Sequence, residues 1–375
     1  MIQRLARFLK RRVLPVVVIF VGAVILFVAA FALKCAFVKP GVPPLHATKR
    51  EIAVPDFGEK NRRPIEDSYF SYPEWYIVWS YEERAQYLPK NLPSGFPYFA
   101  SIGQYWHSYC YICGLTRSRG QFNFGDHLSS MVLGGSFALE YAVRGAYEQT
   151  IGRVSEWTSS HALVEEDAYA AHVAREYADF VYIRPFYEFH FGHALKQLWK
   201  ETPLWGKHPI RKWERKFILS VDYGLEAVYA HAMLFASHIT YGQESDETYS
   251  WIAHTSENLV QDFPRIKKIK DVAPDSLLVS IPRYQEFTDI AVKLAARDVR
   301  FEQIAGNDYI LLTVVVPKNW TYDLPAGDGH LLFTENILTQ PGAKRIAFES
   351  HTLMLSNVLN HFTCENIKIE HIYDY

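Results

Sequence analysis

Residues 276–316 read SLLVSIPRYQEFTDIAVKLAARDVRFEQIAGNDYILLTVVV. Runs rich in Leu, Val and Ile predict strands, and the central segment, with apolar residues three and four positions apart, predicts a helix. The Gly306-Asn307-Asp308 turn predicts a hairpin between the second and third strands. The expected elements are a strand at 276–281, a helix at 282–298, and strands at 299–305 and 309–316.

Strands and helices continue to alternate up to the C-terminus. LLFTEN (331–336) and KRIAFES (344–350) predict a further hairpin, followed by a helix at 351–362 and a last strand at 367–373. This order is typical of a split β-α-β, or ferredoxin-like, layer. We therefore expect residues 247–375 to form a small ferredoxin-like α+β domain.

Residues 68–246 have a helical pattern and predict a mainly helical domain. The capping-box spacing Ser71-x-x-Glu74 predicts that its first helix begins near Tyr72. Its last helix, about 210–241, has apolar residues at three- and four-residue steps, which predicts one stripe facing a core. That stripe consists of Trp213, Phe217, Val221, Leu225, Val228, Ala232, Phe235 and Ile239. The other expected helices cover 98–116, 126–150, 165–184 and 185–201.

The N-terminal region is expected to anchor the chain in a membrane. Residues 13–33, VLPVVVIFVGAVILFVAAFAL, carry no charge, and about 20 apolar residues cross a bilayer as a helix. We predict one transmembrane helix at 13–34, preceded by a basic segment at 1–12 and followed by a proline-rich tether at 35–67. A cleavable signal peptide, with the Ala30-x-Ala32 pattern, is the alternative.

Charge is divided unevenly along the chain, although the whole chain has a formal net charge of −2. Nine of the 39 basic residues and none of the 41 acidic residues lie in 1–50, which leaves the rest of the chain at −11. An acidic body argues against a nucleic-acid partner. The positive-inside rule places the N-terminus in the cytoplasm and the body outside it, in the periplasm of a Gram-negative cell. The residues that set this topology are Arg4, Arg7, Lys10, Arg11 and Arg12.

Histidines are the first candidate functional residues, because imidazole is the commonest side-chain ligand of metal ions in proteins. His190-x-x-His193 places two rings on one helix face, and His231 and His238 follow on the last helix. The carboxylates of that last helix fall on nearly its opposite face, so they do not complete a site. The favoured interpretation is histidines hydrogen-bonded at helix interfaces, with no cofactor; a transition-metal site is the alternative.

Two short motifs are weaker candidates. Cys110-x-x-Cys113 lies in a helical run and lacks the context of a haem, zinc or thioredoxin-like site, so buried small hydrophobes are favoured. The sequence Gly134-Gly135-Ser136-Phe137-Ala138 resembles a nucleophile elbow. A continuous helix with close packing at the glycines is favoured there, because no strand is expected before the serine.

Aromatic residues crowd two segments that follow the tether, 69–79 and 96–111. Such side chains favour the headgroup region of a bilayer, or alternatively form an aromatic core or stack on sugars or a partner. The membrane-interface candidates are Trp75, Trp79, Tyr105 and Trp106. The segments 128–143 and 217–241 are apolar enough to be considered as further membrane spans. Each carries ionisable residues, which are costly inside a bilayer, so helices buried within the protein are favoured.

These features predict a single-span membrane protein with a helical domain and an α+β domain outside the cytoplasm. The expected role is non-enzymatic binding or scaffolding at the membrane surface, with the lipid bilayer and another envelope or membrane protein as partners. The alternative is a membrane-associated enzyme that acts on a lipid or envelope substrate through the histidine-rich site. No residue pattern identifies a substrate or a catalytic set.

Overall fold

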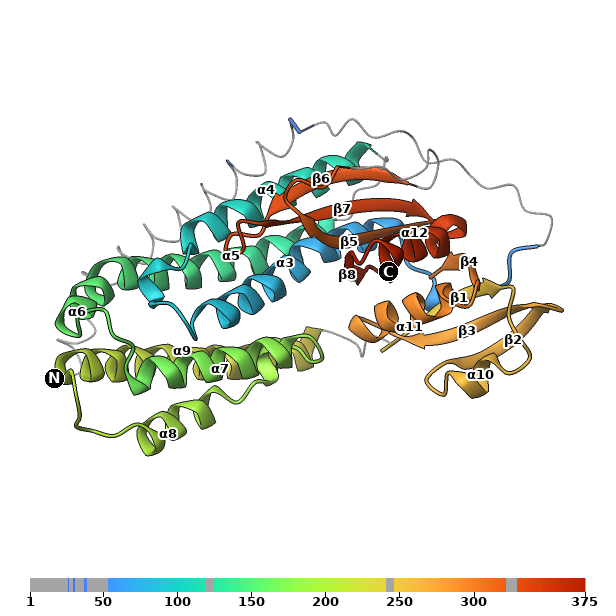
Figure 1. Ribbon diagram of the computed structural model, residues 1–375. Helices are drawn as coiled ribbons and strands as arrows, with labels where there is room; N and C mark the ends of the chain where they lie inside the picture. Colours follow the sequence, from blue (N-terminus) through green and yellow to red (C-terminus); the bar gives the residue numbers. More distant parts are fainter. Residues whose placement is uncertain are drawn as a thin grey trace.

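The computed structural model describes residues 53–118, 124–240, 246–321 and 329–374, together with residues 26, 30, 37 and 38. This part of the chain is a mixed α+β structure in which long helices lie beside two four-stranded antiparallel sheets (Figure 1). The basic segment 1–12, most of the transmembrane helix predicted at 13–34 and about half of the tether predicted at 35–67 lie outside it. Within the described ranges no helix combines the length and apolarity needed to cross a bilayer.

In the helical part, the observed helices agree with the predicted ones in their central residues and differ mainly at their ends. A π-helical turn, η4 (Glu148–Gly152), and short 3-10 turns at 59–61, 93–95 and 186–188 connect the helices. The helices are α3 (Ile65–Tyr87), α4 (Tyr98–Ser118), α5 (Phe124–Tyr147), α6 (Arg153–Thr158), α7 (Glu165–Val181), α8 (Phe191–Glu201) and α9 (Pro209–Thr240).

The first of these helices begins earlier than the capping-box pattern predicted. Pro64 is the N-cap of α3. Acidic residues occupy the first turn of this helix, where their negative charge interacts favourably with the helix dipole. Ser71 and Pro73 therefore lie inside the helix rather than at its start. The Ser71 hydroxyl donates to the Ser68 carbonyl at 2.8 Å instead of capping. Burial of the aromatic side chains along α3 outweighs the local cost of an internal proline.

The described residues of the C-terminal part, 246–321 and 329–374, form eight strands and three helices. The strands are β1 (Glu247–Ala253), β2 (Lys267–Ala273), β3 (Ser276–Pro282), β4 (Arg300–Ile304), β5 (Tyr309–Pro317), β6 (His330–Asn336), β7 (Ala343–His351) and β8 (Lys368–Ile372). The helices are α10 (Leu259–Asp262), α11 (Gln285–Ala295) and α12 (Thr352–Cys364). Sheet A has the order β2-β3-β1-β4, and sheet B has the order β6-β7-β5-β8.

These strands do not make the single ferredoxin-like layer that the sequence predicted. β4 pairs with β1, and β5 pairs with β7 and β8, so the turn at 306–308 joins two sheets rather than two neighbouring strands. Ala305 and Gly306 both have positive φ, at 50° and 84°, which redirects the chain there. The prediction failed because β1, which has no clear pattern in the sequence, occupies the place beside β4.

The two sheets have the same topology. Apart from the short helix α10 between β1 and β2, each is built from three antiparallel strands, a helix and a fourth strand. In each, the second, third, first and fourth strands lie side by side in that order. Residues 247–304 and 309–372 are therefore two copies of one β-β-β-α-β arrangement. The sequence did not reveal this repeat, because the units share an order of elements rather than a set of residues.

The two units share one hydrophobic core. α12 of the second unit packs on β4 of the first, while α11 of the first packs on β8 of the second. The buried cluster includes Ile252, Val279, Phe287, Leu294 and Phe301 from the first unit and Val314, Phe348, Leu355, Leu359 and Phe362 from the second. Because each unit covers apolar surface of the other, the pair forms one structural body.

Sheet B is buried on both faces. Alternate residues of β5, beginning with Ile310 and Leu312, enter the core shared with the helices α11 and α12. Leu311, on the opposite face, joins a second core formed by aromatic side chains of α3, α4 and α5. Sheet B therefore fixes the helical part to the C-terminal part.

Part of the predicted tether packs on sheet A. Phe57 is buried against Trp251 and Leu278 on the face of sheet A opposite the shared core. The backbone N–H of Arg63 donates to the Ala305 carbonyl at 3.0 Å. The segment from residue 53 to the start of α3 is thus bound along the sheet rather than being an extended linker.

Candidate functional site

The three candidate metal ligands whose side chains the structure describes, His190, His193 and His231, are not part of a group of described residues that could hold a metal ion. His190 precedes α8 as its N-cap, and His193 lies in the first turn of that helix, with both residues exposed. His231 is exposed on α9, where its Nδ1 lies 2.6 Å from the Ala227 carbonyl oxygen. The side chain of His238 lies outside the described residues. Among the residues that are described, no group of three His, Cys, Asp or Glu side chains is placed to hold a metal ion.

The four aromatic residues proposed for the membrane interface are core residues instead. Trp75 is 6% exposed, Trp79 and Trp106 are 2% exposed, and Tyr105 has no exposed surface. They pack in the aromatic core between α3, α4, α5 and sheet B. Their burial matches the core alternative that the sequence left open.

The two cysteines of the C-x-x-C pair, Cys110 and Cys113, differ in oxidation state. Cys110 is disulfide-bonded and buried in α4, whereas Cys113, one turn later, carries a free thiol. Burial raises the pKa of the Cys113 thiol, which leaves it protonated and weakly reactive. Both cysteines pack in or against the aromatic core, as the favoured interpretation expected, but the sequence did not predict the disulfide at Cys110.

The resemblance to a nucleophile elbow also has no structural counterpart. α5 is continuous from Phe124 to Tyr147, so Ser136 does not lie on a strand-to-helix turn. The Ser136 hydroxyl accepts a hydrogen bond from the Tyr229 hydroxyl at 3.1 Å. A Cβ atom at Gly134 would lie 2.0 Å from the Tyr105 ring, so the absence of a side chain at Gly134 permits the close packing of α5 on α4.

The apolar stripe of α9 faces outward, contrary to the sequence prediction. Phe217, Leu225 and Val228 are 64%, 65% and 70% exposed. The opposite side of α9 is buried and carries its charged residues. The helix is thus amphipathic, as its pattern predicted, but its polar face is the one that packs against the protein.

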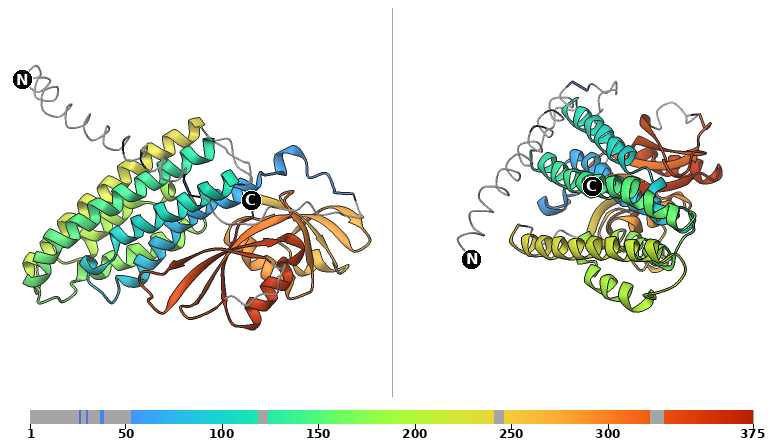
Figure 2. Two further views of the ribbon diagram at one scale, coloured as in Figure 1. Left: turned by 90° about the horizontal axis from the view of Figure 1, so that it is seen from above. Right: turned by 90° about the vertical axis from the view of Figure 1, so that its left-hand side faces the viewer.

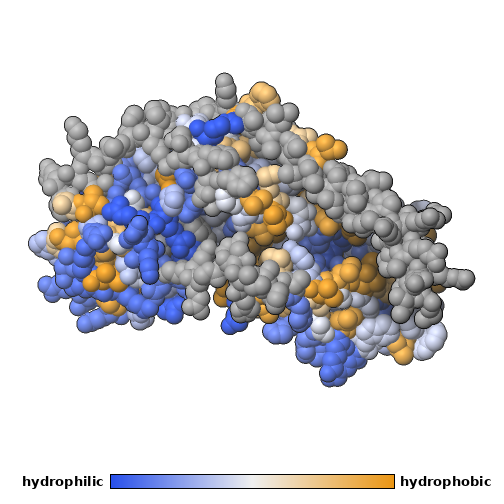
Figure 3. All heavy atoms as spheres, turned by 180° about the vertical axis from the view of Figure 1, so that it is seen from behind, coloured by the Kyte–Doolittle hydropathy of each residue, from blue (hydrophilic) through white to orange (hydrophobic). Residues whose placement is uncertain are grey.

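α5 shows the same inversion beside α9. The Arg144 guanidinium of α5 contacts Asp222 of α9, and the two helices run side by side (Figure 2). Apolar side chains are exposed on this side of the helical part, seen from behind in Figure 3. We call these exposed side chains the α5–α9 apolar face: Leu128, Val132, Leu139, Val143, Phe217, Val221, Leu225 and Val228.

A small charged cavity lies behind this face. Arg144 bonds to Glu140 at 2.5 Å and to Asp222 at 2.6 Å, and Glu226 lies 3.9 Å away. The cavity of about 20 Å³, which also borders Arg84, has room for about one water molecule. Burial, with help from Glu140 and Asp222, raises the pKa of Glu226 to about 8. Glu226 is therefore protonated at neutral pH, which lowers the cost of burying three carboxyl groups around the arginines.

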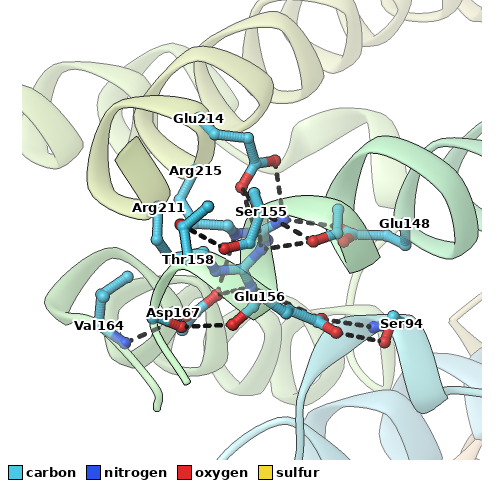
Figure 4. A network of polar contacts seen from close by, with 12 residues as sticks. Ser94, Glu148, Ser155, Glu156, Thr158, Val164, Asp167, Arg211, Glu214 and Arg215 are labelled. Carbon is cyan, nitrogen blue, oxygen red and sulfur yellow. Dashed lines mark hydrogen bonds and ion pairs between the residues drawn. The ribbon is translucent and has the colours of Figure 1, made fainter. Parts of the chain in front are cut away.

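A larger ion network lies at the start of α9 (Figure 4). Arg211, which is fully buried, contacts Asp167 at 3.1 Å and Glu214 at 3.0 Å. Arg215 contacts Glu148 of the π-helical turn at 2.7 Å and Asp167 at 2.9 Å. The network thus joins α9 to the π-helical turn and to the start of α7.

Two lysines extend this network to the acidic first turn of α7. Lys212 contacts Glu165 at 2.7 Å and Glu166 at 3.1 Å, and Lys216 donates to the Thr202 carbonyl at 2.8 Å. The acidic residues at the start of α7 interact favourably with the dipole of that helix. They also balance the positive charge of the cations that are buried at the start of α9. The sequence signal for this network is the run RKWERK at 211–216, whose basic residues fall on one helix face.

A third buried cluster joins α3 to sheet B. The Arg345 guanidinium lies 4.1 Å from the centre of the Trp79 ring and bonds to Glu370 at 2.9 Å. The Tyr72 hydroxyl donates to Glu335 at 2.8 Å, and burial raises the pKa of Glu335 to about 7. These polar groups lie on the face of the sheet that packs on α3, and no pattern in the sequence pointed to them.

The arrangement therefore offers two features with functional potential: an exposed apolar face and charged groups enclosed directly behind it. The enclosed ions bond mainly to one another, which suits holding the helices together. The exposed face suits contact with an apolar medium or partner. Comparison with family models, curated proteins and solved structures finds no match to this chain.

Proposed function

We propose that this protein is a single-span membrane-anchored protein that binds or scaffolds other components at the membrane surface, with its α5–α9 apolar face against the bilayer. The observation that carries the proposal is the inversion of α5 and α9. On each of the two helices a row of apolar side chains is exposed, and charged residues such as Arg144 and Asp222 are turned inward.

An inverted helix indicates an apolar surrounding medium. In water, an amphipathic helix buries its apolar face, and a monomer rarely exposes a large contiguous apolar surface. In or on a bilayer, ionisable side chains instead face the protein interior and pair with each other. Arg144, held between Glu140 and Asp222, fits the second pattern.

The apolar face also begins where the chain would leave its predicted span. The Arg117 side chain donates to the Val38 carbonyl at 3.0 Å, near the end of α4. Val38 follows the last residue of the predicted span, residue 34, by only four positions, about 14 Å of extended chain. α5 starts six residues after α4 ends, so Leu128 and Val132 lie near the expected bilayer surface.

Tryptophans lie near the other end of the face. Trp213 contacts Trp199 and Trp205 at ring-centre distances of 6.2 and 6.1 Å, and all three are partly exposed. Trp side chains favour the interface between hydrocarbon and water. Trp213 and Val228 are 15 residues apart on α9, about 22 Å along the helix, which is less than the hydrocarbon thickness.

The proposal also includes the predicted topology, with the N-terminus in the cytoplasm and the body outside it. The disulfide at Cys110 supports this topology, because disulfides persist in oxidising compartments. The partner at the membrane surface would be another envelope or membrane protein.

Depth-dependent fluorescence quenching tests the membrane contact. In the full-length chain with Cys113 and Cys364 replaced by serine, a fluorophore is attached at Leu225→Cys or Val132→Cys and the protein is placed in lipid vesicles. Spin-labelled lipids should quench both labels. The matched control is Glu176→Cys on α7, whose side chain is 55% exposed against 54% for Val132. Equal quenching at all three positions, or none at positions 132 and 225, would contradict the proposal.

A further inference from the structure

We propose that the outer edge of β8 is a docking site for an extended, acidic segment of a partner protein, which would add to sheet B as a fifth strand. β8 lies at the end of this sheet, whose strand order is β6-β7-β5-β8 (Figure 1). The outer backbone groups of such an edge strand are available for pairing with another chain. Recognition by strand addition combines backbone hydrogen bonds with pockets for alternate side chains.

The duplicated β-β-β-α-β arrangement shows how the corresponding strand of the first unit is covered. β4 is the fourth strand of that unit and also lies at the end of its sheet, with α12 packed on it. Two hydroxyls of α12, one turn apart, bond to backbone carbonyls of β4 and of the residue before it. Thr352 donates to the Glu302 carbonyl at 2.7 Å, and Ser356 donates to the Val299 carbonyl at 2.5 Å. α12 thus covers β4 with hydrogen bonds as well as apolar contacts.

β8 is covered over only part of its length. α11 packs on β8 as α12 packs on β4, and its Thr288 hydroxyl accepts a hydrogen bond from the Ile372 N–H at 2.9 Å. One turn after Thr288, α11 carries Val292, which cannot form such a bond, whereas α12 carries Ser356 one turn after Thr352. No side chain in the described part of the chain bonds to the backbone of residues 368–370. The first half of β8 therefore lacks the side-chain hydrogen bonds that cover the equivalent strand.

A groove of about 660 Å³ lies beside this part of β8. Residues of α11 between Thr288 and Lys293 line one side of it, and residues between Thr363 and Ile369 line the other. Val292 and Ile369 are partly buried against the core that the two units share, so they give the groove an apolar floor. The volume lies in the range of ligand-binding pockets, which leaves room for a short extended segment.

The charge of the groove favours an acidic occupant. Lys293 and Lys368 line the groove and are exposed, and no described carboxylate forms an ion pair with either of them. Asp289, which also lines the groove, accepts a hydrogen bond from the Gln285 amide at 3.2 Å. Alternate side chains of an extended segment point to opposite sides. A segment with alternating apolar and acidic residues would place its apolar side chains on the floor of the groove and its carboxylates beside the two lysines.

The groove gives the scaffolding role a contact site on the body, and the assignment of its partner to the envelope rests on the proposed function. The residues that line the groove belong to α11, α12, β8 and the turn before β8. None of these elements contributes to the α5–α9 apolar face, so a segment bound in the groove would cover no residue of that face.

Fluorescence polarisation of a labelled hexapeptide, acetyl-Glu-Val-Glu-Val-Glu-Val-amide, tests the charge of the groove. The peptide should bind to the full-length protein in detergent, and Lys293→Glu and Lys368→Glu should each weaken binding about fivefold. Lys318→Glu, at an exposed position outside the groove, is the matched control and should bind as wild type does. No binding, equal binding of a peptide with lysine in place of glutamate, or equal affinities of the three variants would each overturn the proposal.

Hydrogen–deuterium exchange of the full-length protein locates the bound peptide. Amides of residues 366–370 should exchange more slowly in its presence, and a fully N-methylated peptide, which lacks backbone donors, should not bind. Protection of β2 or β6 instead of β8, or unchanged affinity of the N-methylated peptide, would contradict strand addition at this edge. Peptide binding without lipid quenching at positions 132 and 225 overturns the membrane contact alone. Quenching without peptide binding overturns the groove alone.

Discussion

Glu335 shows how single buried charges hold this molecule together. Its side chain lies between sheet B and α3, where it accepts a hydrogen bond from Tyr72. The nearby Arg345 bonds to Glu370 and lies over Trp79. A carboxylate oxygen of Glu83 also lies 3.7 Å from the Arg345 guanidinium, so this one guanidinium interacts with more than one carboxyl group. Glu335 therefore keeps its proton at pH values where an exposed glutamate is ionised.

The raised pKa of Glu335 predicts a specific loss of stability with rising pH. The folded state retains this proton up to a pKa of about 7, whereas the unfolded chain releases it near 4.5. Stability from this group is fully present below about pH 4.5 and is lost as the pH rises to about 7. Relative to wild type, Glu335→Gln should gain about 1–3 kcal/mol of unfolding free energy between pH 5 and pH 8.

Urea unfolding at a series of pH values measures this gain. Glu257→Gln, in an exposed loop, is the control and should follow the wild-type pH profile. A constant difference between Glu335→Gln and wild type across the range would disprove the protonation of Glu335 in the folded protein.

At the scale of elements, the two glycines in the middle of α5 have different roles. A side chain at Gly134 would meet the Tyr105 ring, whose hydroxyl is held by the Ser130 carbonyl at 2.6 Å. No heavy atom lies within 4 Å of a Cβ built at Gly135. The sequence suggested close packing at both positions, and the structure requires it at only one.

Alanine substitutions should separate these two glycines. Gly134→Ala should lower the unfolding free energy by about 2 kcal/mol or more, because the buried ring cannot move without losing its hydrogen bond. Gly135→Ala should be neutral or raise stability by up to about 1 kcal/mol, since alanine is the better helix former. Thermal unfolding of the two full-length variants provides the measurement. Equal effects would show that α5 does not pack on α4 at this point.

At the scale of the whole molecule, shared cores join parts that the sequence separates. Leu311 and Ala347 of sheet B belong to the aromatic core of the helices, while Leu312 and Phe348 belong to the core beneath α11 and α12. Sheet B thus has residues in both cores and cannot unfold without exposing each of them.

This arrangement predicts one cooperative unfolding transition for the full chain in detergent. Tryptophan fluorescence, which reports mainly on the helical part, and far-UV circular dichroism should give coincident curves. Leu311→Ala, at a fully buried position, should shift both curves together by about 2–5 kcal/mol. Two separate transitions, or a shift of one curve alone, would mean that the helical and C-terminal parts unfold independently.

The sequence predicted local features well, because these depend on neighbouring residues. Periodicity located the helices 98–118 and 209–240 and the strands 276–282 and 309–317 to within a few residues. It missed β1 and β2, whose patterns are weak, and it joined β4 to β5 because the turn between them resembles a hairpin. Strand pairing is a contact between distant residues, so local patterns do not fix it.

The candidate site could be predicted only in part for a related reason. The sequence alone determined that α9 is amphipathic, that 211–216 is a basic run and that an acidic turn exists at 165–167. It did not determine which face of α9 is buried. The same hydrophobic periodicity occurs in a helix that turns its apolar face to a protein core and in one that turns it to lipid. Only the tertiary structure decided that the charged face of α9 packs inward, where Arg211, Arg215 and Asp222 find oppositely charged partners from distant segments. Those partners are brought together by the fold, and their pairing is what allows the apolar side chains to remain outside.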